Sequence, residues 1–297
     1  MKSKPVLLLC ITLHLCAQGA WAQIPIGSDM RLPRTPFRLQ SRAEIQLPPA
    51  VDNSTRKFFP PILDQKGGSC AQASGIGYMF TYEVNRLLDR DAHASADHRF
   101  SYQFSWNLLN DGQDQGDFVD QGLYLSERYG IMTEQDYGTS GTYQFKWATG
   151  YDKYYKALQY RTQEVLTFAD SIPLMKRWLY DAGDGSAVGG VLTFSAMSRG
   201  WDIDDDYQGP SLTGYRSLLK SLATDGAHAL TIAGYDDTVV YTDAQGTPHT
   251  GAFIVVNSWG THSHDRGRFY LPYDFFRDAR VPEQQLGSTV EAIRVRI

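Results

Sequence analysis

The sequence predicts an α+β fold, in which helices come first along the chain and strands follow. From Ile76 apolar residues recur at helical spacing, which predicts an amphipathic helix over about 70–88, and shorter helical patterns cover 122–129 and 172–181. After these, β-branched and aromatic runs bounded by Gly and Asp predict strands at 187–194, 229–233, 239–242 and 253–256. This order indicates a helical N-terminal half that packs on a C-terminal antiparallel β half.

The first 22 residues have the features of a secretory signal peptide. Two lysines precede an apolar run over residues 6–16 that is too short to span a bilayer, and small residues suit cleavage after Ala22. Lipoprotein processing at Cys16 is disfavoured, because Leu15 stands where a small residue is needed. No later segment is long and apolar enough for a membrane helix. We therefore expect a secreted or periplasmic protein.

The rest of the chain is expected to be one domain with a short N-terminal extension. Residues 23–61 hold seven prolines without periodicity, which predicts an extended segment; its first part, 23–46, is expected to be a short arm, and 47–297 are expected to form the domain. Hydrophobic residues make up 42% of the sequence and aromatic residues 13%, enough to bury a sizeable core. The net charge of −5, with both signs interspersed, gives no basic stripe for nucleic acid and no polybasic membrane patch.

Cysteine usage singles out one residue. Cys10 and Cys16 leave with the signal peptide, so the exported chain has Cys70 alone and no internal disulfide. By itself, a lone thiol is either a buried bystander or a reactive group. Ser69 and Gln72 have the spacing of a capping box, which predicts that Cys70 occupies the first helical position. The positive end of a helix favours the thiolate, the form that attacks a carbonyl.

Two polar residues lie at the edges of predicted strands. His228 opens one apolar run and Asn257 closes another. Alone, such a histidine is more often a structural residue, and such an asparagine is usually a turn former. Together with Cys70 they form a Cys, His and Asn set that is typical of nucleophilic catalysis.

Two other clusters are candidates for metal binding, and both are disfavoured. The acidic stretch 202–206 lacks the glycine and the closing glutamate of a calcium loop, so a solvated loop is the better interpretation. His262 and His264 have no third ligand close in sequence, which favours a surface pair over a zinc site. We expect no metal and no organic cofactor.

Four segments, in order along the chain, resemble the papain-like cysteine peptidases. These are 47–52, 60–70 with its Asp-Gln before the cysteine, 130–137 with Gly-Ile-Met-Thr-Glu, and 257–261 with Asn-Ser-Trp-Gly. The resemblance implies a papain-like fold with the active-site cleft between the two halves, and hydrolysis of peptides or proteins through an acyl-enzyme. It assigns the nucleophile to Cys70, the base to His228, the orienting residue to Asn257, an oxyanion donor to Gln65 and a screening role to Trp259.

The sequence also departs from the family pattern. Gln65 precedes Cys70 by five positions instead of six, Ala71 replaces a tryptophan, and Gly67 replaces a disulfide-forming cysteine. Ser263 and His264 stand where a second Trp-Gly is usual. Residues 23–46 are too short for a helical inhibitory prosegment, which favours a bacterial exported protein.

Two alternatives to a peptidase stay open. One is a papain-fold module that binds a peptide or another polymer without cutting it, as the short loop before Cys70 would allow. The other is an acyltransferase that uses the same triad and passes the acyl group to an amine. The sequence does not favour any particular oligomeric state.

Overall fold

The computed structural model describes residues 30–39, 45–110, 112–138, 148–221, 223–243, 246–279 and 290–297. The predicted signal peptide lies outside these residues. The described chain is α+β, as predicted, with helices grouped in the first half and most strands in the second. The helices are α1 Cys70–Gln72, α2 Thr81–Leu88, α3 Tyr102–Leu109, α4 Val119–Tyr129, α5 Glu134–Tyr137, α6 Tyr151–Ala157, α7 Ile172–Asp181 and α8 Tyr273–Ala279, with short 3₁₀ turns at Asn53–Thr55 and Ala96–His98.

The long helix predicted over residues 70–88 is confirmed. It runs through α1, a π-helical stretch η2 (Ala73–Phe80) and α2, and it ends at Asp89 in the left-handed conformation. Every residue of η2 is buried. The apolar face does not extend to the last turn, because Leu87 and Leu88 are exposed.

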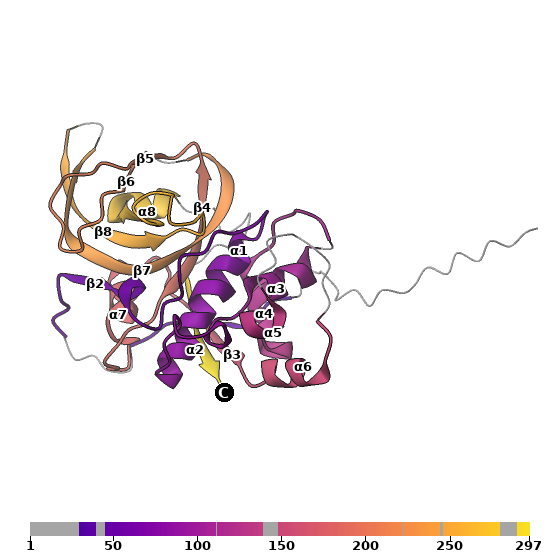
Figure 1. The fold of residues 1–297 in the computed structure, drawn as a ribbon. Helices are drawn as coiled ribbons and strands as arrows, with labels where there is room; N and C mark the ends of the chain where they lie inside the picture. The colour runs from indigo at the N-terminus through magenta and orange to yellow at the C-terminus, as the bar shows by residue number, and fades with distance from the viewer. Residues whose placement is uncertain are drawn as a thin grey trace, which may run out of the picture.

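The strands form one twisted sheet with the order β1-β3-β10-β4-β7-β8-β9-β6-β5, and β2 pairs with β7. Most neighbours are antiparallel, as expected, but β1–β3 and β6–β9 are parallel. Figure 1 shows β4 to β8 and α8 gathered on one side of the molecule and α1 to α6 on the other. The strands are β1 Arg34–Pro36, β2 Ala50–Asp52, β3 Arg161–Thr167, β4 Leu192–Arg199, β5 Asp202–Asp204, β6 Leu218–Ser221, β7 Asp225–Thr242, β8 Pro248–Val256, β9 Arg268–Pro272 and β10 Glu291–Arg296.

Two predicted strands prove to be one. Residues 229–233 and 239–242 both belong to β7, an 18-residue strand whose pairing with β8 shifts register between Ile232 and Gly234 and again between Asp236 and Val240. The gap expected between residues 233 and 239 is an irregularity within one strand, and the buried carboxylate of Asp236 there accepts N–H groups from Leu212 and Thr213. Residues 187–191 precede β4 and are not part of it.

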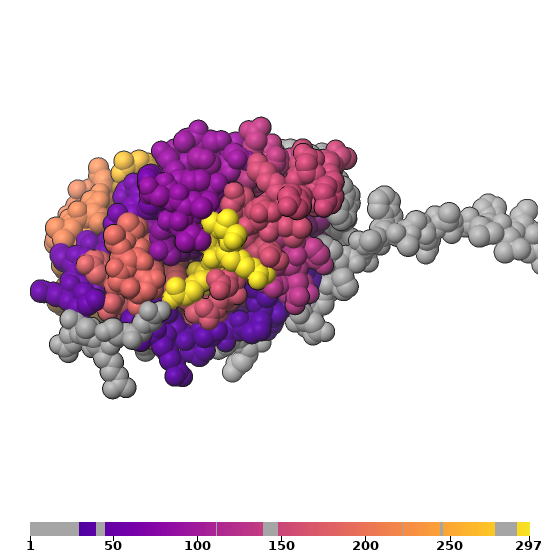
Figure 2. All heavy atoms as spheres, turned by 90° about the horizontal axis from the view of Figure 1, so that it is seen from below, coloured from indigo at the N-terminus to yellow at the C-terminus, as the bar shows by residue number. Residues whose placement is uncertain are grey.

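The described part of the predicted arm, residues 30–39, contributes to the core. Its strand β1 pairs with β3, and the Phe37 ring packs against Phe168 and Trp178 with centroids 4.8 and 5.5 Å away. The C-terminal strand β10 packs against α2 and η2, and Figure 2 shows it in yellow at the surface beside the purple helix. None of the helices in the described ranges combines the length and the apolar composition that crossing a membrane requires.

Candidate active site

The thiol of Cys70 lies where the helix meets the β half. Cys70 is a free cysteine at the first residue of α1, and the backbone N–H of Ala229 on β7 lies close enough to its thiol to lower the pKa of that group. Burial raises the pKa of Cys70, an effect that the N–H groups of Ala229, Ala71 and Cys70 itself oppose. The helix start therefore acts in the expected direction, but desolvation outweighs it, so the resting group is the neutral thiol rather than the thiolate.

His228 lies next to that contact, on β7. Its Nε2 is 2.8 Å from Asn257 Oδ1, and because an amide oxygen only accepts, Nε2 carries the proton. The other ring nitrogen, Nδ1, is then left as a proton acceptor. Burial lowers the pKa of His228 to about 4, while the hydrogen bond to Asn257 raises it and His264 lowers it further. The resting imidazole is therefore neutral.

Asn257 follows the last residue of β8 and is fully buried. Its Oδ1 accepts from the backbone N–H of Ser258 as well as from His228, and its Nδ2 lies 3.3 Å from His264 Nε2. Its backbone carbonyl accepts from the Tyr78 hydroxyl on η2. Asn257 is thus fixed by its side chain and by its backbone.

Trp259 covers the face of the histidine. Its ring stacks on His228 with centroids 4.7 Å apart and an interplanar angle of 26°. The pairing of Thr231 with Val256 brings the end of β8 and the residues after it alongside the first residues of β7. The strand register therefore brings the segment that contains His228 next to the segment that contains Asn257.

Gln65 is held beside Ser258 despite the shortened loop. Its backbone N–H donates to the Ser258 carbonyl at 2.7 Å, its Oε1 accepts from the Ser258 hydroxyl at 2.5 Å, and its Nε2 donates to the Gly67 carbonyl at 3.0 Å. Nε2 carries a second hydrogen in addition to the one used by Gly67. The Gln65 amide is therefore anchored one residue away from Asn257.

Two glycines close the short loop between Gln65 and Cys70. Gly67 has φ of +59°, and a Cβ there would lie 2.2 Å from Asp114 Oδ1. The Gly68 N–H donates to the same oxygen at 2.7 Å, and a Cβ on Gly68 would meet the backbone of Gln115 at 2.8 Å. Only glycine fits both positions, so the loop packs closely against the Asp114 side chain and the Gln115 backbone.

The capping box predicted for Ser69 and Gln72 is wrong. The Ser69 hydroxyl turns back and donates to the Lys66 carbonyl at 2.8 Å, and no side chain caps the helix start. The Gln72 side chain is buried and donates to the Phe118 carbonyl at 3.1 Å. Gly122 makes this possible, because a Cβ there would lie 1.9 Å from Gln72 Oε1. The Ser69 and Gln72 side chains therefore bond to Lys66 and Phe118 and do not form the capping box.

Two residues near the site were not predicted to belong to it. His264, expected as half of a surface pair, instead packs beside Trp259 and contacts Asn257; only His262 is exposed. Asp117 lies close enough to Cys70 for its charge to raise the thiol pKa, and its own burial raises the Asp117 pKa to about 8. The one feature of the sequence that could have indicated a role for His264 was its position, seven residues after Asn257.

Neither disfavoured metal site is assembled in the structure. Within the described ranges, no three His, Cys, Asp or Glu side chains form a group that could hold a metal ion. Asp205, from the acidic stretch, accepts from the Ser217 hydroxyl and lies 3.5 Å from His264.

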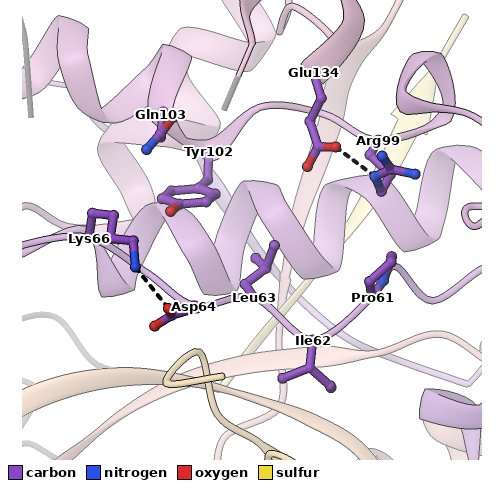
Figure 3. Close-up of a pocket in the computed structure, with 9 residues that line it drawn as sticks. All are labelled: Pro61, Ile62, Leu63, Asp64, Lys66, Arg99, Tyr102, Gln103 and Glu134. Carbon is purple, nitrogen blue, oxygen red and sulfur yellow. Dashed lines mark hydrogen bonds and ion pairs between the residues drawn. The ribbon is translucent and has the colours of Figure 1, made fainter. Parts of the chain in front are cut away.

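A pocket of about 320 Å³ lies on the helical side of the segment that leads to Cys70. Figure 3 labels its nine lining residues, which are Pro61, Ile62, Leu63, Asp64, Lys66, Arg99, Tyr102, Gln103 and Glu134. The charges within it are paired: Lys66 with Asp64 at 2.8 Å and Arg99 with Glu134 at 2.6 Å. None of the candidate catalytic side chains lines this pocket.

Comparison with solved structures identifies the fold. Xylellain, a cysteine protease from Xylella fastidiosa, is 19% identical, with a TM-score of 0.55 over 84% of this chain and 87% of its own. ProCathepsin B S9 from Trypanosoma congolense is 16% identical, with a TM-score of 0.57 over 88% of this chain and 82% of its own. Procathepsin L 3 from the larval midgut of Tenebrio molitor is 14% identical, with a TM-score of 0.56 over 88% and 73%.

Comparisons based on sequence alone give no match for this chain. No family model matches the chain, and no curated protein matches it. The fold is therefore papain-like, as the sequence analysis predicted, in a divergent sequence.

Proposed function

We propose that this protein is an exported cysteine peptidase that hydrolyses peptide bonds through Cys70, His228 and Asn257. The observation that carries the proposal is the hydrogen bond from His228 Nε2 to Asn257 Oδ1, made next to the Ala229 N–H that contacts the thiol. This arrangement leaves His228 Nδ1 as the acceptor for the thiol proton. Export is proposed from the signal-like residues 1–22, and no cofactor or metal is required for covalent acyl transfer.

In the first half-reaction, His228 Nδ1 takes the proton from Cys70 as the sulfur attacks the substrate carbonyl carbon. The carbonyl electrons move to oxygen, and the oxyanion is stabilised by the Cys70 backbone N–H and by the second hydrogen of Gln65 Nε2. The C–N bond then breaks, and the leaving amine takes the proton from His228. The product of this step is a thioester on Cys70.

In the second half-reaction, water replaces the amine. His228 accepts a proton from the water as its oxygen attacks the thioester, and the same proton returns to sulfur when the acid departs. Throughout, Asn257 keeps the His228 ring in one orientation, and the stacked Trp259 shields their hydrogen bond from solvent.

The direct test is cleavage of a mixed peptide library by the purified protein, with products identified by mass spectrometry. The wild type is expected to release new peptide termini, and Cys70→Ala to release none. Adding a primary amine during the reaction distinguishes hydrolysis from acyl transfer, since a transferase yields the amide of that amine.

One observation favours a second candidate, a peptide-binding module without activity: burial raises the pKa of the Cys70 thiol. A thiol-reactive peptide analogue separates the two functions. A peptidase labels at Cys70 much faster than free cysteine does at pH 5–6, because only a thiol with a working base reacts there. A protein that neither cleaves the library nor labels faster than free cysteine is a binding module.

A further inference from the structure

His264 lies in the loop between β8 and β9, in the place where the family pattern has a Trp-Gly. Its side chain is only 11% exposed, and its ring packs against Phe269 with centroids 5.1 Å apart and against Trp259 at 6.2 Å. Its Nε2 lies 3.3 Å from Nδ2 of Asn257. The ring is therefore buried on the side of Asn257 opposite His228.

The hydrogen bonds of Asn257 decide where the proton on His264 lies. The backbone N–H of Ser258 can only donate, and it points at Asn257 Oδ1 at 2.8 Å, so the amide oxygen must face that side. Asn257 Nδ2 then necessarily faces His264 and needs an acceptor there. His264 Nε2 must therefore be unprotonated, which places the proton of the neutral ring on Nδ1.

Asp205 lies on the far side of the ring. Its Oδ1 is 3.5 Å from His264 Nδ1, too long for a full hydrogen bond, and accepts from the Ser217 hydroxyl at 2.6 Å. A carboxylate near Nδ1 favours the tautomer that the Asn257 contact requires. Asp205, His264, Asn257 and His228 thus form one line of contacts that ends at the proposed base.

We propose that His264 is a positioning residue for the reaction proposed above: its neutral ring accepts the Asn257 amide and keeps Asn257 Oδ1 on His228, and its protonation releases that amide. The inference rests on the proposed function, because it concerns how the base of that reaction is held. His264 touches neither substrate nor the reacting atoms in this mechanism.

Protonation reverses the role of His264 Nε2. A protonated ring presents N–H to the N–H of Asn257 Nδ2, so two donors face each other and the contact is lost. Burial is the largest effect on the pKa of His264 and lowers it, while the charge of Asp205 raises it. The other titratable group beside this site is His228, whose own pKa His264 lowers. Neutral His264 is therefore the form present at pH 7, and the acceptor is lost only at lower pH.

The first test does not depend on catalysis. Proton–nitrogen NMR of the histidine side chains in the wild type, with the His264 signals assigned by their absence in His264→Gln, reports which ring nitrogen is protonated. We expect a protonated Nδ1 and an unprotonated Nε2 at pH 7. The Nε2-protonated tautomer would overturn the proposal outright.

The second test is the pH profile of kcat/KM from pH 4 to pH 8. His264→Phe keeps the ring packing and removes the acceptor, and we expect a loss of about two- to tenfold at pH 7, mainly in kcat, as one ordinary hydrogen bond supports. His264→Gln supplies an acceptor that does not titrate, so it should restore activity at pH 7. Below pH 6.5 it should exceed the wild type progressively, by up to the factor lost in His264→Phe.

The matched control is His262→Gln, two residues away on the exposed side of the same loop. We expect its profile to be parallel to that of the wild type at every pH. If His264→Gln also runs parallel to the wild type, or if His264→Phe is fully active, His264 does not position Asn257. If His264→Phe does not fold, His264→Asn replaces it. His264 has φ of +54°, a conformation that asparagine favours, and the asparagine side chain is too short to reach Asn257.

If the protein is not a peptidase, the positioning role of His264 can still be tested separately. In a protein that hydrolyses nothing, the rate at which iodoacetamide alkylates Cys70 replaces kcat/KM in the same series. The same ranking of variants and the same divergence below pH 6.5 would support the positioning role without a peptidase. Equal rates in all the variants would reject it.

Discussion

The Ser258 hydroxyl donates to Gln65 Oε1 at 2.5 Å, and the Ser258 carbonyl accepts the Gln65 backbone N–H at 2.7 Å. The loop that leads to the nucleophile is therefore tied to the residue that follows Asn257. This pair of contacts compensates for the position missing between Gln65 and Cys70, because it fixes the Gln65 amide from outside the loop.

Replacing Gln65 with Ala should lower kcat by about 10²–10³, equivalent to about 2.7–4 kcal/mol, with KM little changed, because one donor to the developing oxyanion is removed. Steady-state kinetics measure the effect, and circular dichroism verifies folding. Ser258→Ala is the companion variant: it keeps the Gln65 amide but frees it to move, so its loss should be smaller. A change below about threefold in Gln65→Ala would mean that another donor serves the oxyanion.

Cys70→Ser and His228→Ala should each abolish hydrolysis to a similar extent while leaving the fold intact, since the two side chains act as one unit. The measurement is kcat/KM on a peptide identified from the library. A His228→Ala protein that kept more than about a tenth of wild-type activity would exclude His228 as the base, because general base catalysis contributes 10²–10⁴-fold.

Asn257→Ala should cost much less than either of those changes and should act mainly on kcat. The stacking of Trp259 on His228, with centroids 4.7 Å apart, continues to orient the ring when the amide is gone. Comparison of kcat and KM with those of the wild type checks this. An Asn257→Ala variant as inactive as Cys70→Ser would mean that Asn257 does more than orient the base, or that the site collapses without it.

Gly67→Ala should disturb the loop before Cys70 and lower both stability and activity. The new Cβ would lie 2.2 Å from Asp114 Oδ1 and would also impose φ of +59° on a residue with a side chain, at about 1–2 kcal/mol for the backbone alone. Gly200→Ala separates the two causes, because Gly200 has φ of +86° with no atom within 4 Å of an added Cβ. We expect Gly200→Ala to lose stability but keep kcat/KM.

The folded protein should lose stability as the pH falls from 6.5 to 4, in part because of His228. Burial lowers its pKa to about 4, so in this window the unfolded chain binds a proton that the folded protein does not. The penalty is absent above pH 6.5 and reaches about 3 kcal/mol near pH 4. Denaturant unfolding at several pH values measures it. His228→Gln, which does not titrate, should show a flatter dependence; an equally steep one would contradict the assignment.

The sequence predicted the residues that carry recognisable local chemistry. Cys70 at a helix start and Asn257 at a strand end follow from runs of neighbouring residues. His228 was expected to open a strand, but it lies inside β7, which begins three residues earlier, at Asp225. The long helix was predictable for the same reason, since apolar residues recur at helical spacing from Ile76 to Leu88.

What the sequence did not predict depends on distant partners. Residues 234–238 lie between two predicted strands, but they belong to β7, and the Asp236 carboxylate there accepts N–H groups from residues 212 and 213. The Gln72 side chain, predicted to cap the helix, donates instead to the Phe118 carbonyl, 46 residues away in the chain. His264 was interpreted as a surface residue because nothing next to it in sequence indicates that β9 and Trp259 enclose it.

The hydrogen bond from the Gly68 N–H to Asp114 holds the loop before Cys70 in place, one residue after Gly67, where the family pattern has a disulfide-forming cysteine. A reductant cleaves sulfur–sulfur bonds, and this hydrogen bond contains none. The geometry before Cys70 is therefore independent of the redox potential of the surroundings. Thiol reductants can keep Cys70 reduced without loosening the loop that presents it.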